Sequence, residues 1–392
     1  MTRYVLAFLI VAIPAAARAQ DGDSRTVQDI VDFLVTNQGV QTNDFDRDRA
    51  AADATRDTLT RALLSAVATV PVGSSSSGFV YRLNPELGTV ERASETFGPF
   101  FVERALTSGR GQGSFGIALQ AADFRSLDGN SLDDGTLVTT ANQFVDEAEP
   151  FDVETLALEI STRTATIVGN VGVSDRVDIG AAVPIVRLDV NGSRVNTYRG
   201  RTLLQARGEA HTTGLGDIAV RTKVRLTPDG PGAAAAAAEV RLPTGREEDL
   251  LGTGKAALRL MGIASAEAGA ANVIGNVAFG FGGLGREISY SGALAVAATP
   301  RFTLIGELLA RRLEGLQRIT PVTAPHPRIQ NVTTRRLVPA GENETAVYAV
   351  TGFKWNVGAT WLLHGHVLMP LTDHGLTTRI TPTIALDYAF TR

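Results

Sequence analysis

The chain has 392 residues, no cysteine and a formal net charge of −4. The lack of cysteine excludes disulfides and thiolate metal sites, and the absence of a basic excess argues against a nucleic-acid partner. No metal or other cofactor is expected. Glycine is frequent, at 40 residues, and aromatic residues make up only 6%, a composition that suits many turns and closely packed strands but only weak aromatic girdles.

The first residues predict export from the cytoplasm. Arg3 gives a positive start, Val5 to Ala17 form a short apolar run, and Ala17-Arg18-Ala19 places small residues at the cleavage positions. We therefore predict a signal peptide over residues 1–19, cleaved near Ala19. The alternative, a membrane anchor, is disfavoured because a run of about 13 residues is shorter than the roughly 20 that a spanning helix needs.

Residues 24–69 are predicted to be helical. A first apolar stripe has the spacing of one helix face and consists of Val27, Ile30, Val31 and Leu34. A second helix is expected from about Asp44 to Ala68, ended by Pro71, and a Ser-rich linker follows at Ser74 to Ser77. Residues 20–77 are interpreted as an N-terminal helical segment, either a solvated extension or a plug in a pore.

From Gly78 onward the apolar period changes from 3.6 to 2. No later segment resembles a membrane-spanning helix, so a chain that spans a membrane would have to cross it as a closed barrel. The last strand alternates most clearly: its apolar face is Ile380, Pro382, Ile384, Leu386, Tyr388 and Phe390. We predict an all-β fold, a transmembrane antiparallel β-barrel over residues 78–392 with about 14 strands, or 12 as the alternative.

Connection lengths support this topology independently of hydropathy. The expected strands are 78–83, 97–107, 113–123, 153–171, 177–190, 215–227, 233–243, 255–267, 272–283, 287–298, 302–313, 344–356, 359–370 and 378–390. Counted back from the C-terminus, the long connections 124–152, 191–214, 244–254 and 314–343 all fall on one side of the sheet. Short periplasmic turns and long outer loops are typical of bacterial barrels.

Three short motifs resemble the outer-membrane family named for the meta-pathway of phenol degradation. They are a strand-turn-strand over Gly172 to Pro184, Gly214-Leu215-Gly216-Asp217-Ile218 before an alternating strand, and Leu242-Pro243-Thr244-Gly245 followed by Gly252-Thr253-Gly254. The resemblance covers roughly residues 150–390. It extends more distantly to the outer-membrane transporters of fatty acids and aromatic hydrocarbons. The resemblance also implies the barrel-assembly machinery as a partner. Such barrels usually end on an aromatic residue as an assembly signal, whereas Thr391 and Arg392 follow Phe390 here.

Nothing in the sequence predicts a catalytic site. Gly280 to Gly285 matches G-x-G-x-x-G but precedes another strand rather than the helix of a dinucleotide site. His364 and His366 share a strand face, yet two imidazoles alone do not complete a metal site. A membrane-embedded hydrolase stays an alternative, disfavoured because no G-x-S-x-G turn marks a nucleophile.

Charged and imidazole side chains on the polar strand faces are the candidate lumen residues. They should point inward, because Arg or Lys facing lipid would cost roughly 2–4 kcal/mol at the membrane midplane. The set is Glu159, Arg163, Arg221, Lys223, Arg225, Glu239, Arg241, Arg259, Lys354, His364, His366, Arg379 and Asp387. They could line a pore or simply fill the barrel with paired charges.

The resemblance implies a location in the bacterial outer membrane and a channel or transporter, not an enzyme, for uptake of small hydrophobic or aromatic compounds. The expected partners are outer-membrane lipid and the transported solute. A structural barrel with a blocked lumen is the second hypothesis.

Overall fold

The computed structural model describes residues 26–36, 45–68, 73–75, 78, 81–84, 89–92, 94–144, 151–228, 232–358 and 360–391. The predicted signal peptide and residues 76–77 of the Ser-rich linker lie outside these residues. In the described part of the chain no helix is long and apolar enough to cross a membrane. Most of the described residues belong to one large antiparallel sheet.

Twelve strands of this sheet close into a barrel, because the last of them pairs with both β16 and β3. In barrel order they are β3 (Gln112–Leu127), β6 (Phe151–Ser174), β7 (Val177–Tyr198), β9 (Ile218–Arg225), β10 (Gly232–Leu242), β11 (Ala257–Ala268), β12 (Ala271–Gly282), β13 (Glu287–Thr299), β14 (Phe302–Pro325), β15 (Val332–Gly358), β16 (Trp361–Pro370) and β18 (Thr381–Thr391). The predicted transmembrane barrel fold is confirmed. Its strand number is the alternative of 12, not 14.

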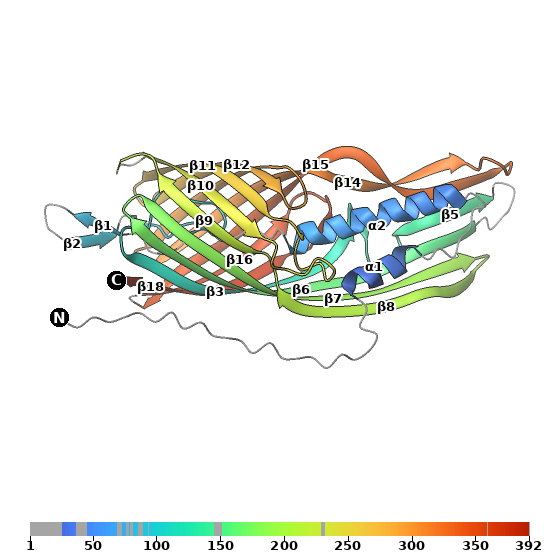
Figure 1. Ribbon diagram of the computed structural model, residues 1–392, viewed down its shortest axis with the longest axis horizontal. Helices are drawn as coiled ribbons and strands as arrows, with labels where there is room; N and C mark the ends of the chain where they lie inside the picture. The colour runs from blue at the N-terminus through green and yellow to red at the C-terminus, as the bar shows by residue number, and fades with distance from the viewer. Residues whose placement is uncertain are drawn as a thin grey trace.

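The two surplus predicted strands explain the difference. Residues 81–84 form β1 (Tyr81–Asn84), which pairs only with β2 (Thr89–Arg92) in a hairpin beyond the barrel's end (Figure 1). Residues 94–108, which we call the lumen segment, form neither helix nor strand. Gly98 and Pro99 break the alternation there, and Phe97, Phe100 and Val102 are buried rather than exposed to lipid.

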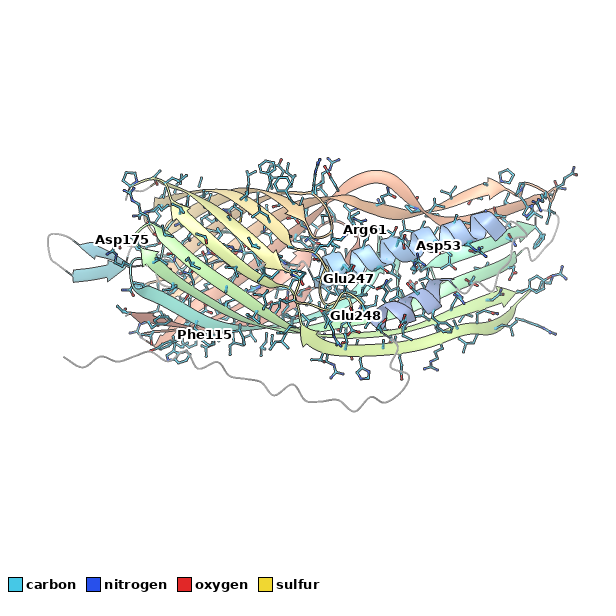
Figure 2. The ribbon with its side chains drawn as sticks, in the orientation of Figure 1. Asp53, Arg61, Phe115, Asp175, Glu247 and Glu248 are labelled. Atoms are coloured by element: carbon cyan, nitrogen blue, oxygen red, sulfur yellow. The ribbon has the colours of Figure 1, made fainter. Side chains whose placement is uncertain are left out.

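The outer face of the barrel is apolar, as a lipid-facing surface must be. The apolar face predicted for the last strand is exposed, and its Asp387 is buried. Phe115 on β3 points away from the barrel (Figure 2), with 48% of its surface exposed. Trp361 and Tyr388 lie side by side on this face, with ring centroids 4.9 Å apart, as in an interfacial aromatic girdle.

Long and short connections separate to opposite ends, as predicted (Figure 1). The end that holds the short turns and the C-terminus is called periplasmic below, and the other end outer. Residues 244–254 form a loop, but the other three long connections contain strands. β7, β14 and β15 continue outward as strands, and β8 (Arg201–Leu215), β4 (Asn130–Ser131), β5 (Val138–Phe144) and β17 (Leu376–Thr378) join them.

The two predicted helices lie against this outward extension of the sheet (Figure 1). They are α1 (Val27–Thr36) and α2 (Phe45–Val67). α1 begins with a capping box, since the Thr26 hydroxyl accepts a hydrogen bond from the Asp29 N–H and the Asp29 carboxylate accepts one from the Thr26 N–H. α1 contacts β7 and β8, and α2 contacts β14, β15 and β17.

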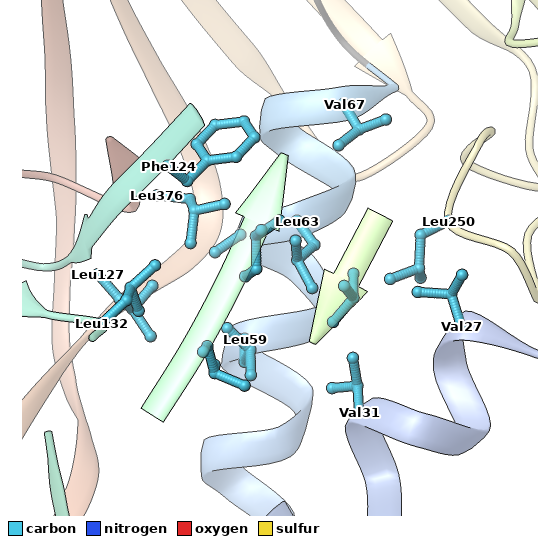
Figure 3. Packing of buried hydrophobic residues seen from close by; sticks show 14 of the residues in the cluster. Val27, Val31, Leu59, Leu63, Val67, Phe124, Leu127, Leu132, Leu250 and Leu376 are labelled. Carbon is cyan, nitrogen blue, oxygen red and sulfur yellow. The ribbon is translucent and has the colours of Figure 1, made fainter. Parts of the chain in front are cut away.

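The apolar stripes of both helices form the main hydrophobic core (Figure 3). Leu34 and Leu63 are fully buried, against wall residues that include Leu188. Gly192 allows the close approach of α1, because a Cβ there would lie 2.4 Å from Leu34 Cδ1. The buried Arg194 donates a hydrogen bond to the Leu34 carbonyl near the end of α1, at 2.7 Å. The main core of this protein therefore lies around the two helices at the outer end.

Candidate functional site

The lumen segment is held inside the barrel by hydrogen bonds to charged wall residues. The carboxylate of Glu307 on β14 accepts hydrogen bonds from the N–H groups of Phe100, Phe101 and Val102, the last at 3.1 Å. Lys354 on β15 donates to the Pro99 carbonyl at 3.1 Å. A backbone without regular structure needs such partners once it is buried.

A second group of charges joins the segment to the opposite wall. Glu103 of the segment forms ion pairs with Arg221 and Lys223 on β9. Arg221 also pairs with Glu239 on β10, and Lys223 lies 3.7 Å from Asp178 on β7. These side chains are almost completely buried, so removing one partner would leave an uncompensated charge, at a cost of about 3–5 kcal/mol.

The register of the sheet explains why these charges meet. Arg221, Glu239 and Arg259 are direct neighbours across β9, β10 and β11, so charges of opposite sign alternate along one row. A charged wall residue also holds the periplasmic end of the segment, since the Asp178 carboxylate on β7 accepts a hydrogen bond from the Ser108 N–H at 3.0 Å. The lumen segment is therefore fixed at both walls by ionised groups.

The two histidines lie on the inner face of β16, next to the segment's aromatic rings. His364 Nε2 lies 3.3 Å from the Asp387 carboxylate. His366 packs on Phe100 and Phe101, with ring centroids 4.3 and 5.1 Å apart. No group of three or more His, Cys, Asp or Glu suited to a metal occurs among the described residues.

Among the cavities formed by the described residues, two lie in the lumen between the segment, the inner wall and the end of α2. One has a volume of about 110 Å³ and the other about 140 Å³, and both have Phe101, Gln120 and Thr164 in their walls. The first also contacts His366 and Val186. A cavity of roughly 150 Å³ can hold a molecule as large as benzene, so this lumen has room for a small solute.

Most predicted lumen residues lie inside the barrel. The buried ones are Arg221, Lys223, Glu239, Lys354, His364, His366 and Asp387. Arg225, Arg241 and Arg259 are half-buried on the same inner faces. The structure thus brings together, around the lumen segment, side chains that the sequence places on six different strands.

Three predicted lumen residues do not face the lumen. Glu159 and Arg163 are exposed on the outer face of β6, where Arg163 pairs with Asp123 at 2.9 Å. Arg379 is exposed in the connection between β17 and β18. Charged side chains must point into the barrel only where lipid surrounds the strand. Beyond the lipid, the inner face of β6 packs on the helices and is apolar, so its charged face meets water.

Glu103, Glu307 and Asp178 belong to the site but were not predicted. Glu103 was assigned to a strand of its own, which hid its role as a counter-ion. Asp178 and Glu307 both alternate with exposed neighbours on their strands, Ile179 and Leu308. Strand parity could therefore have identified Asp178 and Glu307, whereas nothing local identifies Glu103.

Two of the three family-like motifs meet around one carboxylate at the outer end of the barrel. Asp217 accepts hydrogen bonds from the N–H groups of Gly245 and Thr253, at 3.1 and 2.9 Å, and from the Thr253 hydroxyl at 3.0 Å. Gly252 must lack a side chain, since its Cβ would lie 2.4 Å from the Asp217 carboxylate. The motifs thus fold the β10–β11 connection back, so that Leu251 lines the smaller cavity.

Two solved outer-membrane proteins are similar to the chain at low sequence identity. The chain is similar to the COG4313 outer membrane channel from Pseudomonas putida F1, with 12% identity, 73% of this chain and 98% of that chain covered, and a TM-score of 0.43. It is also similar to the translocator domain of the autotransporter NalP from Neisseria meningitidis, with 9% identity, coverages of 72% and 89%, and a TM-score of 0.38.

No curated protein matches the sequence. The family described as "Putative MetA-pathway of phenol degradation" matches residues 136–307. The resemblance inferred from the sequence motifs is therefore confirmed over these residues.

Proposed function

We propose that the protein is an outer-membrane channel for small hydrophobic or aromatic compounds, closed in this state by its lumen segment. The observation that carries the proposal is the pair of cavities between the segment and the wall. A barrel that only served as a scaffold would have no need of solute-sized space at membrane depth. The match to a family named for phenol degradation supports apolar cargo.

The chemistry of the lumen fits such cargo. Apolar side chains such as Val168 and Val186 line the smaller cavity, together with the Phe100 and Phe101 rings. Most small-molecule sites have this character, an apolar wall with a few polar groups that set orientation. Passage requires the segment to move, because it occupies the lumen between the two walls.

A blocked, purely structural barrel is the second candidate, and one observation favours it. The segment is held by buried ion pairs on both sides, including those of Glu103 with Arg221 and Lys223. If these contacts never open, no solute would pass.

Solute flux through reconstituted protein separates the two candidates. Purified protein in liposomes would be tested for entry of a small neutral solute, as wild type and as Glu103→Gln. We expect measurable flux in the wild type and faster flux in the variant, because Arg221 and Lys223 lose their counter-ion on the segment. Glu159→Gln, the same change on the outer face, should have no effect. Absence of flux from both wild type and Glu103→Gln would favour the structural barrel.

A further inference from the structure

The smaller lumen cavity contains buried polar atoms that the protein does not use. His366 is 7% exposed, lines this cavity, and neither of its ring nitrogens has a hydrogen-bond partner among the described residues. Buried polar groups are almost always hydrogen-bonded, since an unsatisfied one costs free energy. A neutral imidazole offers one donor and one acceptor.

Two hydroxyls in the same cavity share this property. Thr383 on β18 is the direct cross-strand neighbour of His366, and the buried Thr383 Oγ1 has no partner in the described residues. The buried Oγ of Ser74, which precedes the lumen segment, also has no hydrogen-bond partner in the described residues. The cavity thus presents hydrogen-bonding atoms from both the wall and the lumen chain.

The rest of the cavity wall selects against charge. Its ionised groups have partners within the protein. Asp387 lies 3.3 Å from His364, and Arg241 lies 3.2 Å from Glu239. Lys354 donates to the Pro99 carbonyl, and Asp217 accepts from the Thr253 N–H. An anionic or cationic ligand would lose its hydration without finding a free counter-ion there. The Phe100 and Phe101 rings beside His366 provide apolar contact instead.

We propose that this cavity is a binding site for a small neutral molecule that carries one hydroxyl group on an apolar body. The hydroxyl both donates and accepts, so it can bond one ring nitrogen of His366 and the Thr383 hydroxyl together. The body packs on Phe100 and Phe101. This inference rests on the proposed function and names the chemical class of its cargo.

Isothermal titration of the purified full-length protein with two probes of similar shape tests the proposal. Cyclohexanol carries the hydroxyl, and cyclohexanecarboxylate carries an anion in its place. The variants are His366→Phe, which keeps a ring against Phe100 but removes both nitrogens, and Thr383→Val, which keeps the shape but removes the hydroxyl. His211→Phe, on the exposed side of β8, is the matched control.

We expect the wild type and the control to bind cyclohexanol and neither to bind the carboxylate. Each lumen variant should bind cyclohexanol about tenfold more weakly, as the loss of one buried hydrogen bond implies. Equal affinity in wild type and both lumen variants, or no cyclohexanol binding by the wild type, would overturn the proposal.

The liposome flux assay keeps this result separate from the proposed function. If flux of the solute used in that assay is unchanged in both lumen variants, with no loss of cyclohexanol affinity, the protein is a channel without this site. Binding that depends on His366 in a protein that shows no flux leaves the site but removes the channel.

Discussion

At the scale of single residues, the lumen is organised by carboxylates that hold backbone. Glu307 accepts hydrogen bonds from three successive N–H groups of the lumen segment, and Asp217 holds both ends of the β10–β11 connection. Hydrogen bonds to an ionised acceptor are stronger than those to a neutral one. A carboxylate can therefore fix irregular chain where no strand ladder is available.

Replacing Glu307 with glutamine should loosen the lumen segment without opening the barrel. The amide keeps one accepting oxygen, so at least one of the three N–H groups loses its partner, at a cost of about 1–3 kcal/mol. Hydrogen exchange at Phe100, Phe101 and Val102 should become faster. Glu314→Gln, an exposed change on the same strand, should leave this exchange as in the wild type. Unchanged exchange in Glu307→Gln would show that the carboxylate does not hold the segment.

Replacing Asp217 with asparagine should release the β10–β11 connection. The amide nitrogen cannot accept the hydrogen bonds that one carboxylate oxygen receives from Thr253. Limited proteolysis should then cut residues 244–254 faster than in the wild type. The control is Glu248→Gln, an exposed change within the same connection. Equal cutting of Asp217→Asn and wild type would contradict a fastening role for the family-like motif.

At the scale of elements, the two helices have a core of their own above the barrel. Leu63 is fully buried there and takes no part in the strand ladders. Leu63→Ala should destabilise the packing of α1 and α2 by about 2–5 kcal/mol, which faster hydrogen exchange in both helices would report. Leu260→Ala, on the lipid-facing side of β11, is the control, since it leaves no internal cavity. Faster heat-induced unfolding of the barrel in Leu63→Ala than in wild type would contradict this separation.

Strands and helices at regular periods could be predicted from the sequence, and the lumen segment could not. The stripe of Val27, Ile30, Val31 and Leu34 places α1 correctly, and the alternation from Ile380 to Phe390 places the outer face of β18. Phe97 to Val102, by contrast, is as apolar as a strand, but it is buried by the barrel that surrounds it. Its position depends on Glu307 and Lys354, more than 200 residues away along the chain.

The inward direction of a charged side chain could be predicted only where lipid surrounds the strand. Arg221 and Lys223 must point inward because lipid lies outside, and they do. Glu159 and Arg163 obey the same alternation, but their part of β6 extends beyond the lipid, where the charged face meets water. No local pattern marks the residue at which a strand leaves the membrane, so the two cases look alike in the sequence.

At the scale of the whole molecule, the chain combines a lipid-facing cylinder with two internal occupants. The helices and their core lie at the outer end (Figure 1). The lumen segment lies inside the barrel, where charged side chains of two walls hold it. The barrel itself is held by continuous strand ladders. The segment, in contrast, is held by individual side chains. The part that closes the lumen is therefore the part that can move without unfolding the wall.

A reversible cross-link between segment and wall tests this account most directly. The chain has no cysteine of its own, and the Ala105 N–H donates to Ser265 Oγ on β11 at 3.3 Å, so Ala105→Cys with Ser265→Cys would tie the segment in place. Solute flux through liposomes would be measured before and after reduction, with each single variant as control. We predict no flux in the oxidised double variant and flux like wild type after reduction. Equal flux in both states would contradict closure by the lumen segment.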